Sequence, residues 1–124
     1  MKRVLILGGA GAIGSRTIGA ALACSAAHEI VVADLSLDAA AKAAAHHPGR
    51  AVPLQLDVFD EAALRAAMRS VDAVLNCAGP FYRTSLPCLK AAIAEKRIYL
   101  DVCDGWDTTR EALALDGAAR EAGI

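Results

Sequence analysis

The sequence lacks the features that mark several large classes of protein. Aromatic residues make up only 4% of its 124 residues, and acidic and basic residues are interspersed with a formal net charge of −1. No basic run and no patch of mixed basic and aromatic residues indicates a nucleic-acid partner. No apolar run is long enough to cross a bilayer, and the run that follows Arg3 stops at glycines too soon for a signal peptide. We therefore expect a soluble, cytoplasmic protein with neither a nucleic-acid nor a membrane partner.

Cysteine is present, but not in the spacings that bind metals or form redox pairs. Cys24, Cys77, Cys88 and Cys103 form no CxxC pair and no ligand cluster with the histidines. This spacing disfavours zinc and disulfide sites, so we expect no metal and small buried thiols in a reducing compartment. Cys77 has no neighbouring histidine in the sequence to activate it as a nucleophile. The sequence therefore identifies no catalytic residue.

What the sequence does contain is an alternation of strand-like and helix-like segments. Its 124 residues are enough for one domain with a sizeable core, although much of the 56% hydrophobic content is alanine, which favours helices. Strands are predicted at residues 4–7, 29–34, 51–57, 72–76 and 97–102. Helices are predicted at residues 12–25, 37–47, 61–70, from about 85, and from 108 to near 123. This order predicts an α/β fold with a doubly wound parallel sheet of strand order 3-2-1-4-5.

Local signals refine several of these elements. Ser36 and Asp60 are expected to cap the second and third helices with their side-chain oxygens. Pro53 cannot donate a backbone hydrogen bond, so the third strand is expected at an edge of the sheet. Pro87 would be tolerated in the first turn of the fourth helix, and the capping box Thr108–Glu111 would open the last helix.

The first predicted strand leads directly into a glycine-rich turn, after which a helical pattern begins. The turn and the first helical residues are Gly8, Gly9, Ala10, Gly11, Ala12, Ile13 and Gly14. A strand, a glycine turn and a helix in this order are what a dinucleotide-binding βαβ unit requires. Gly9 would permit the tight turn, Gly11 would let a pyrophosphate approach the backbone, and Gly14 would let the helix pack closely. The free N–H groups at the helix N-terminus would then face the phosphates.

Asp34 stands at the carboxyl end of the second predicted strand, about twenty residues beyond Gly14 and at the spacing expected for this motif. A carboxylate there can accept hydrogen bonds from both hydroxyls of an adenosine ribose, and it would repel a 2′-phosphate. No arginine follows it, because the next residues are Leu35 and Ser36. The sequence therefore favours NAD over NADP as the cofactor.

Two further segments at predicted strand ends complete the candidate site. Asp57 and Val58 close the third strand, where a carboxylate and the backbone could meet an adenine edge, although a simple polar turn explains them as well. The segment 76–81 follows the fourth strand at the switch point of the sheet, where ligands bind in open α/β folds. Within it, small Ala78 and Gly79 leave room for a flat ring. The candidate cofactor-binding residues are Gly8, Gly9, Gly11, Ala12, Ile13, Gly14, Asp34, Leu35, Asp57, Val58, Cys77, Ala78, Gly79 and Pro80.

These segments together resemble the N-terminal domain of saccharopine dehydrogenase-like oxidoreductases over the whole chain. The resemblance is carried by residues 4–14, Asp34, Asp57–Val58, Asn76–Phe81, Tyr99–Asp104 and Glu121–Ile124. Its most specific part is Ala78–Phe81, because many families share the glycine motif. The resemblance implies a nicotinamide cofactor, with hydride transferred to or from a carbon–nitrogen bond of an amino acid or polyamine.

The resemblance also implies a role for individual residues. By matching position, Gly9, Gly11 and Gly14 would hold the pyrophosphate. Asp34 would hold the ribose, and the segment 78–80 would lie on the nicotinamide side. Some members of this family use NADP, so the resemblance leaves NADP open.

The predicted strand count bears on domain organisation. A doubly wound sheet of this type needs one more strand after the last helix, where this sequence stops. We therefore expect residues 1–124 to be the dinucleotide-binding domain of a longer enzyme and to be inactive alone. A second domain would then grip an amino acid or amine substrate. The uncovered edge of the strand at residues 97–102 would favour a symmetric homodimer.

Two other functions fit the same glycine spacing. Gly8-x-x-Gly11-x-x-Gly14 also suits an atypical short-chain dehydrogenase, although the Tyr-x-x-x-Lys motif of that group is missing. The residue four positions after Tyr82 is a leucine, and the one four positions after Tyr99 is a cysteine. The other alternative is a module that senses NAD(H) and catalyses no reaction.

Overall fold

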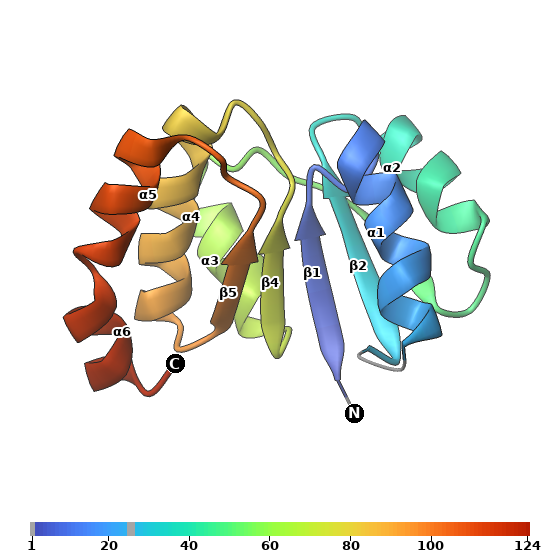
Figure 1. Ribbon diagram of the computed structural model, residues 1–124. Helices are drawn as coiled ribbons and strands as arrows, with labels where there is room; N and C mark the ends of the chain where they lie inside the picture. Colours follow the sequence, from blue (N-terminus) through green and yellow to red (C-terminus); the bar gives the residue numbers. More distant parts are fainter. Residues whose placement is uncertain (1, 25–26) are drawn as a thin grey trace.

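A computed structural model describes residues 2–24 and 27–124 of the chain (Figure 1). Five parallel strands form one sheet in the order β3-β2-β1-β4-β5, which confirms the predicted fold class and places β3 at an edge. The strands are β1 (Arg3–Leu7), β2 (Glu29–Asp34), β3 (Ala51–Gln55), β4 (Ala73–Asn76) and β5 (Ile98–Asp101). The helices within the described residues are α1 (Ala12–Ala23), α2 (Leu37–Ala45), α3 (Glu61–Arg69), α4 (Phe81–Ala94), α5 (Trp106–Leu113) and α6 (Asp116–Ala122).

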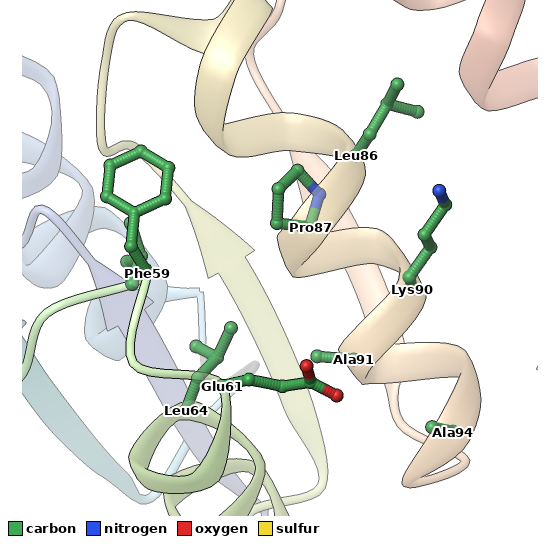
Figure 2. A pocket seen from close by; sticks show the side chains of 9 residues that line it. Phe59, Glu61, Leu64, Leu86, Pro87, Lys90, Ala91 and Ala94 are labelled. Atoms are coloured by element: carbon green, nitrogen blue, oxygen red, sulfur yellow. The ribbon is translucent and has the colours of Figure 1, made fainter.

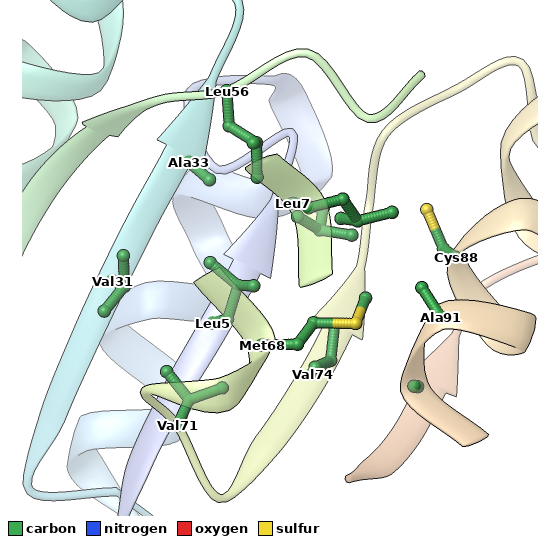
Figure 3. Close-up of a cluster of buried hydrophobic side chains, with 12 residues drawn as sticks. Leu5, Leu7, Val31, Ala33, Leu56, Met68, Val71, Val74, Cys88 and Ala91 are labelled. Atoms are coloured by element: carbon green, nitrogen blue, oxygen red, sulfur yellow. The ribbon is translucent and has the colours of Figure 1, made fainter. Parts of the chain in front are cut away.

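Buried side chains alternate between the two faces of the sheet along β1. Leu5 and Leu7 belong to the core cluster that α3 and α4 cover, whereas Ile6 belongs to the cluster that α1 and α2 cover. This alternation follows from the two-residue period of a strand, and burial of both faces explains why the strands are nearly all apolar. Figure 3 shows the first cluster, with Met68 and Cys88 packed against the strands. Burial raises the pKa of the Cys88 thiol to about 12, so this cysteine acts as a small core residue.

The strand register brings the loops that carry the predicted site residues together at the carboxyl ends of the strands. Leu7 pairs with Ala33 on one side and with Asn76 on the other. The ladder continues beyond the strands, because the N–H of Gly9 donates to the carbonyl of Ala33 at 3.0 Å and that of Cys77 donates to Leu7 at 2.8 Å. The segments that follow β1, β2 and β4 therefore leave the sheet side by side.

The two predicted helix caps are present. The Ser36 hydroxyl accepts a hydrogen bond from the N–H of Ala39 at 3.2 Å, and the Asp60 carboxylate accepts one from the N–H of Ala63 at 3.0 Å. Most predicted boundaries agree with the structure to within one or two residues, as is usual for frayed ends. Residue 25, to which the first helix was predicted to extend, lies outside the described residues.

Two predicted helix starts are wrong. Helix α4 begins at Phe81 rather than near Ser85, because the carbonyl of Pro80 already accepts hydrogen bonds from the N–H groups of residues 83 and 84. Pro87 therefore lies inside this helix and not in its first turn. The predicted last helix is in fact two, α5 and α6, and Gly105 rather than Thr108 caps the first of them. Thr108 lies within the first turn of α5 and is buried there, so it is not the residue that caps this helix.

Strand β5 lies at the second edge of the sheet, as its place in the predicted order requires. The side chains of Ile98 and Leu100 are 57% and 59% exposed, while Tyr99 between them packs against the core. The self-association predicted through this edge stays a prediction.

We expect Leu5→Ala to lower the free energy of unfolding by about 2–5 kcal/mol, because it removes a fully buried side chain and leaves a cavity. Leu100→Ala is the matched control in another strand, and we expect it to cost less than about 1 kcal/mol because Leu100 is largely exposed. Urea unfolding followed by circular dichroism measures both. Equal losses would contradict the placement of the core.

Candidate functional site

The turn after β1 depends on the backbone conformation of Gly8. This residue has a φ of 68°, in the left-handed region that glycine tolerates best. A Cβ on Gly8 would also lie 2.7 Å from the Cα of Ala78, in the loop after β4. The conformational requirement predicted for Gly9 therefore falls on Gly8, while a Cβ on Gly9 would clash with Val32 at 2.7 Å.

Helix α1 packs on this turn more tightly than any side chain would allow. A Cβ on Gly14 would lie 2.2 Å from the carbonyl oxygen of Gly8, which confirms the close helix packing predicted for this glycine. Gly11 is the N-cap of α1, and no side chain caps this end of the helix. The first N–H groups of α1 therefore have no capping side chain, and such a helix end is a site where an anion binds favourably.

Asp34 links the end of β2 to the glycine turn. One carboxylate oxygen accepts a hydrogen bond from the N–H of Ala10 at 3.2 Å, and the other accepts one from the N–H of Ser36 at 3.3 Å. Each oxygen retains a lone pair for a further donor. Leu35, the next residue, is 67% exposed, and it lines the same cleft as Asp34.

A cleft of about 360 Å³ lies at the carboxyl ends of β1, β2 and β4. It is lined by Leu7, Gly8, Gly11, Ala33, Asp34, Leu35, Leu56, Asp57, Val58, Phe59, Cys77, Ala78, Gly79 and Thr84. Nine of these fourteen residues are predicted site residues, so the structure gathers most of the candidate site in one cleft. Their role in binding a cofactor stays a prediction.

Five predicted site residues do not line the cleft. The Cα of Gly9 packs against Val32, and the Cα of Gly14 packs against the Gly8 carbonyl. Ala12 and Ile13 border a separate hollow along α1, and Pro80 is the N-cap of α4.

The structure also adds lining residues that sequence reasoning missed. Leu7, Ala33 and Leu56 stand at or just beyond strand ends, a position that could have identified them. Phe59 follows the Asp57 turn, in which the Asp57 carboxylate accepts a hydrogen bond from the Phe59 N–H at 2.9 Å. The guanidinium of Arg83 lies over the Phe59 ring, with its central carbon 5.1 Å from the ring centre, in a cation–π contact.

Cys77 borders the cleft but is poorly suited to act as a nucleophile. Burial raises the pKa of its thiol, and a hydrogen bond with Thr17 offsets part of this increase. The thiolate is therefore disfavoured near neutral pH.

A second and larger groove, of about 510 Å³, lies between α3 and α4 (Figure 2). It shares Val58 and Phe59 with the cleft, and Glu61 and Lys90 are the charged residues that line it. The glycine turn and Asp34 are not part of this groove, so the groups suited to a dinucleotide lie in the smaller cleft.

Residues 2–24 and 27–124 contain no group of three or more His, Cys, Asp and Glu side chains placed to hold a metal ion. None of the helices in the same part of the chain combines the length and apolar character needed to cross a bilayer.

The sheet order, the uncapped helix after the glycine turn and the acidic residue at the end of β2 define a dinucleotide-binding α/β domain of the Rossmann type. Comparison with protein families makes this assignment more specific. Residues 4–124 match the saccharopine dehydrogenase NADP binding domain, and the chain belongs to this family. It is therefore a domain of a family of NAD(P)-dependent oxidoreductases.

Solved structures support the same assignment. The chain is 27% identical to apo saccharopine dehydrogenase (L-Glu forming) from Saccharomyces cerevisiae, with a TM-score of 0.81. The match covers 100% of this chain and 26% of the yeast enzyme. It is 22% identical to AtPrR2 with NADP+ and (+)pinoresinol, with a TM-score of 0.68, over 99% of this chain and 47% of that one.

A third structure is dTDP-glucose 4,6-dehydratase from Bacillus anthracis in complex with NAD, at 22% identity and a TM-score of 0.65, over 82% of this chain and 37% of that one. At such low identity, the second and third likenesses show the fold alone. No curated protein matches the chain.

We expect Gly8→Ala to destabilise the domain by about 1–3 kcal/mol, because alanine is strained at this φ and its Cβ would meet the backbone of Ala78. Gly117→Ala, in α6, is the control: its Cβ would meet nothing within 4 Å, so we expect stability to be unchanged or raised by up to about 1 kcal/mol. Urea unfolding compares the two, and equal effects would contradict the close contact between the two loops.

Proposed function

We propose that this domain binds NAD(H) in the cleft at the carboxyl ends of β1, β2 and β4. The main support is the uncapped N-terminus of α1 beside the Asp34 carboxylate, which places donors for a pyrophosphate next to acceptors for a ribose. The nicotinamide group would supply the hydride chemistry. The residues of this chain would bind and orient it.

Asp34 supports NAD rather than NADP. At about 4 Å and an effective dielectric constant of about 20, a 2′-phosphate charge beside this carboxylate would cost about 4 kcal/mol before screening. The described residues that line the cleft include no lysine or arginine to offset this repulsion. The family description mentions NADP, and the neighbouring structures include one with NADP+ and one with NAD, so these names do not decide between the cofactors.

The two halves of the cofactor would occupy different parts of the cleft. The turn at Asp57 and Val58 would meet the adenine, and the loop from Ala78 to Pro80 would meet the nicotinamide. This arrangement follows the general rule that a dinucleotide lies across the switch point of an open sheet, which here falls between β1 and β4.

For the whole protein, we propose an oxidoreductase that acts on a carbon–nitrogen bond of an amino acid or related amine. The likeness to yeast saccharopine dehydrogenase supports this substrate class. The chain spans only 26% of that enzyme, so the groups that grip the substrate would belong to a further domain. We also propose that a second copy of the chain covers the edge strand β5, because Ile98 and Leu100 on this strand are largely exposed.

We expect Gly11→Val to abolish NAD binding in calorimetric titrations of the 124-residue chain. The new side chain would start 3.2 Å from the Gly8 carbonyl, at the N-cap of α1, and its branches would occupy the place of the pyrophosphate. Gly117→Val, in open space on α6, should bind NAD like the unmodified chain. Unchanged affinity in Gly11→Val would contradict the assigned site.

We expect the double variant Asp34→Ser with Leu35→Arg to raise the ratio of NADP to NAD affinity at least about tenfold, because it exchanges a repulsive charge for an attractive one. Asp34→Ser with Leu35→Gln is the control for side-chain length without charge, and it should shift the ratio less. Titrations with both cofactors at one salt concentration measure the effect. Tighter binding of NADP than NAD by the unmodified chain would show that the interpretation of Asp34 is wrong.

A further inference from the structure

A chain of hydrogen bonds connects the end of β5 to the loop after β4. The Asp101 carboxylate accepts a hydrogen bond from the Tyr99 hydroxyl at 3.0 Å, and that hydroxyl accepts one from the side-chain amide of Asn76 at 3.1 Å. The amide oxygen of Asn76 in turn accepts a hydrogen bond from the N–H of Ala78 at 2.9 Å. Asn76 is fully buried, so its bonds to Tyr99 and Ala78 take the place of the water that the amide would otherwise bind.

Thr84, in the first turn of α4, holds the other backbone polar group of the same residue, Ala78. Its hydroxyl donates to the carbonyl of Ala78 and lies 3.5 Å from the Asn76 amide nitrogen. Both backbone polar groups of Ala78 are therefore bound by side chains. Thr84 is 2% exposed, and water has little access to compete for these bonds.

The position of Ala78 matters because its backbone is in contact with the glycine turn. A Cβ on Gly8 would lie 2.7 Å from the Cα of Ala78 and 2.8 Å from its nitrogen. The hydrogen bonds that hold Ala78 thus set the spacing between the segments after β1 and β4. Both segments line the cleft.

We propose that Asn76 and Thr84, oriented by Tyr99 and Asp101, are positioning residues that set the shape of the nicotinamide half of the cleft. This inference rests on the proposed binding of NAD(H). Because the Ala78 N–H already donates to Asn76, Ala78 has no free donor for the ring, and its bonded backbone positions the ring mainly by shape. Tyr99 does not line the cleft, so it acts on the cofactor through its partners, the Asn76 amide and the Ser85 carbonyl in α4, which lies 3.3 Å from its hydroxyl.

The protonation state of Tyr99 is consistent with this role. Burial, followed by smaller effects that include the neighbouring Asp101, raises the pKa of its hydroxyl far above the ordinary value, while the hydrogen bond from Asn76 lowers it in part. The hydroxyl therefore stays protonated and donates a hydrogen bond to the Asp101 carboxylate.

The test compares NAD with ADP-ribose, which has the same adenosine and pyrophosphate but no nicotinamide. We expect Tyr99→Phe and Thr84→Val each to weaken NAD binding about three- to tenfold and to change ADP-ribose binding by less than about twofold. Thr84→Ser, which keeps the hydroxyl, should bind NAD with nearly the affinity of the unmodified chain. Thr108→Val is the matched control, because it removes a buried threonine hydroxyl outside this network and should leave both affinities unchanged.

Equal weakening of both ligands, or of neither, would overturn the inference, because a merely structural role would not select the nicotinamide half. If the unmodified chain binds NAD and only this selectivity is missing, the proposed function stands and the positioning role fails. If the unmodified chain binds neither ligand, both fail. Amide hydrogen exchange at Ala78 is a second measurement that needs no variant: slow exchange is expected, and free exchange would overturn the inference.

Discussion

The arrangement of the whole site depends on backbone contacts that leave no room for a side chain. The turn after β1 touches the loop after β4 at Gly8 and Ala78, and α1 touches the same turn at Gly14. Three elements can meet this closely only because two of the contacting residues are glycines. Their convergence exposes the first N–H groups of α1 at the edge of the sheet where parallel strands end, and the cleft is the space that remains between these loops.

The sequence predicted the sheet well because burial on both faces makes the central strands β1 and β2 nearly continuous apolar runs. The caps at Ser36 and Asp60 were also predictable, since a side-chain oxygen bonded two or three residues ahead is a local signal. The starts of α4 and α5 were missed for the opposite reason. Their N-caps, Pro80 and Gly105, make no side-chain hydrogen bond, so tertiary packing sets these starts and no local motif marks them.

The same distinction applies to the site. Asp34 and the glycines could be recognised because their spacing along the chain reflects one βαβ unit. Thr84 was missed because it depends on where α4 begins, and Phe59 because its exposure and its contact with Arg83 are properties of the folded chain. The part of Asn76 in the network could not be predicted either, since its partners come from two other elements.

The two sides of the cleft differ in what their backbones offer a ligand. On the side of α1 the helix N-terminus has no capping side chain, so its N–H groups suit a charged and strongly hydrated pyrophosphate. On the side of β4 the peptide groups of Ala78 are already satisfied by Asn76 and Thr84, which leaves a surface of small residues with few free donors. A charged group is desolvated at a lower free-energy cost where hydrogen-bond donors replace its water. A flat ring binds most favourably where it leaves no polar group of the protein without a hydrogen-bond partner. The orientation that we propose for NAD(H), with its pyrophosphate at α1 and its nicotinamide at the loop after β4, follows from this difference.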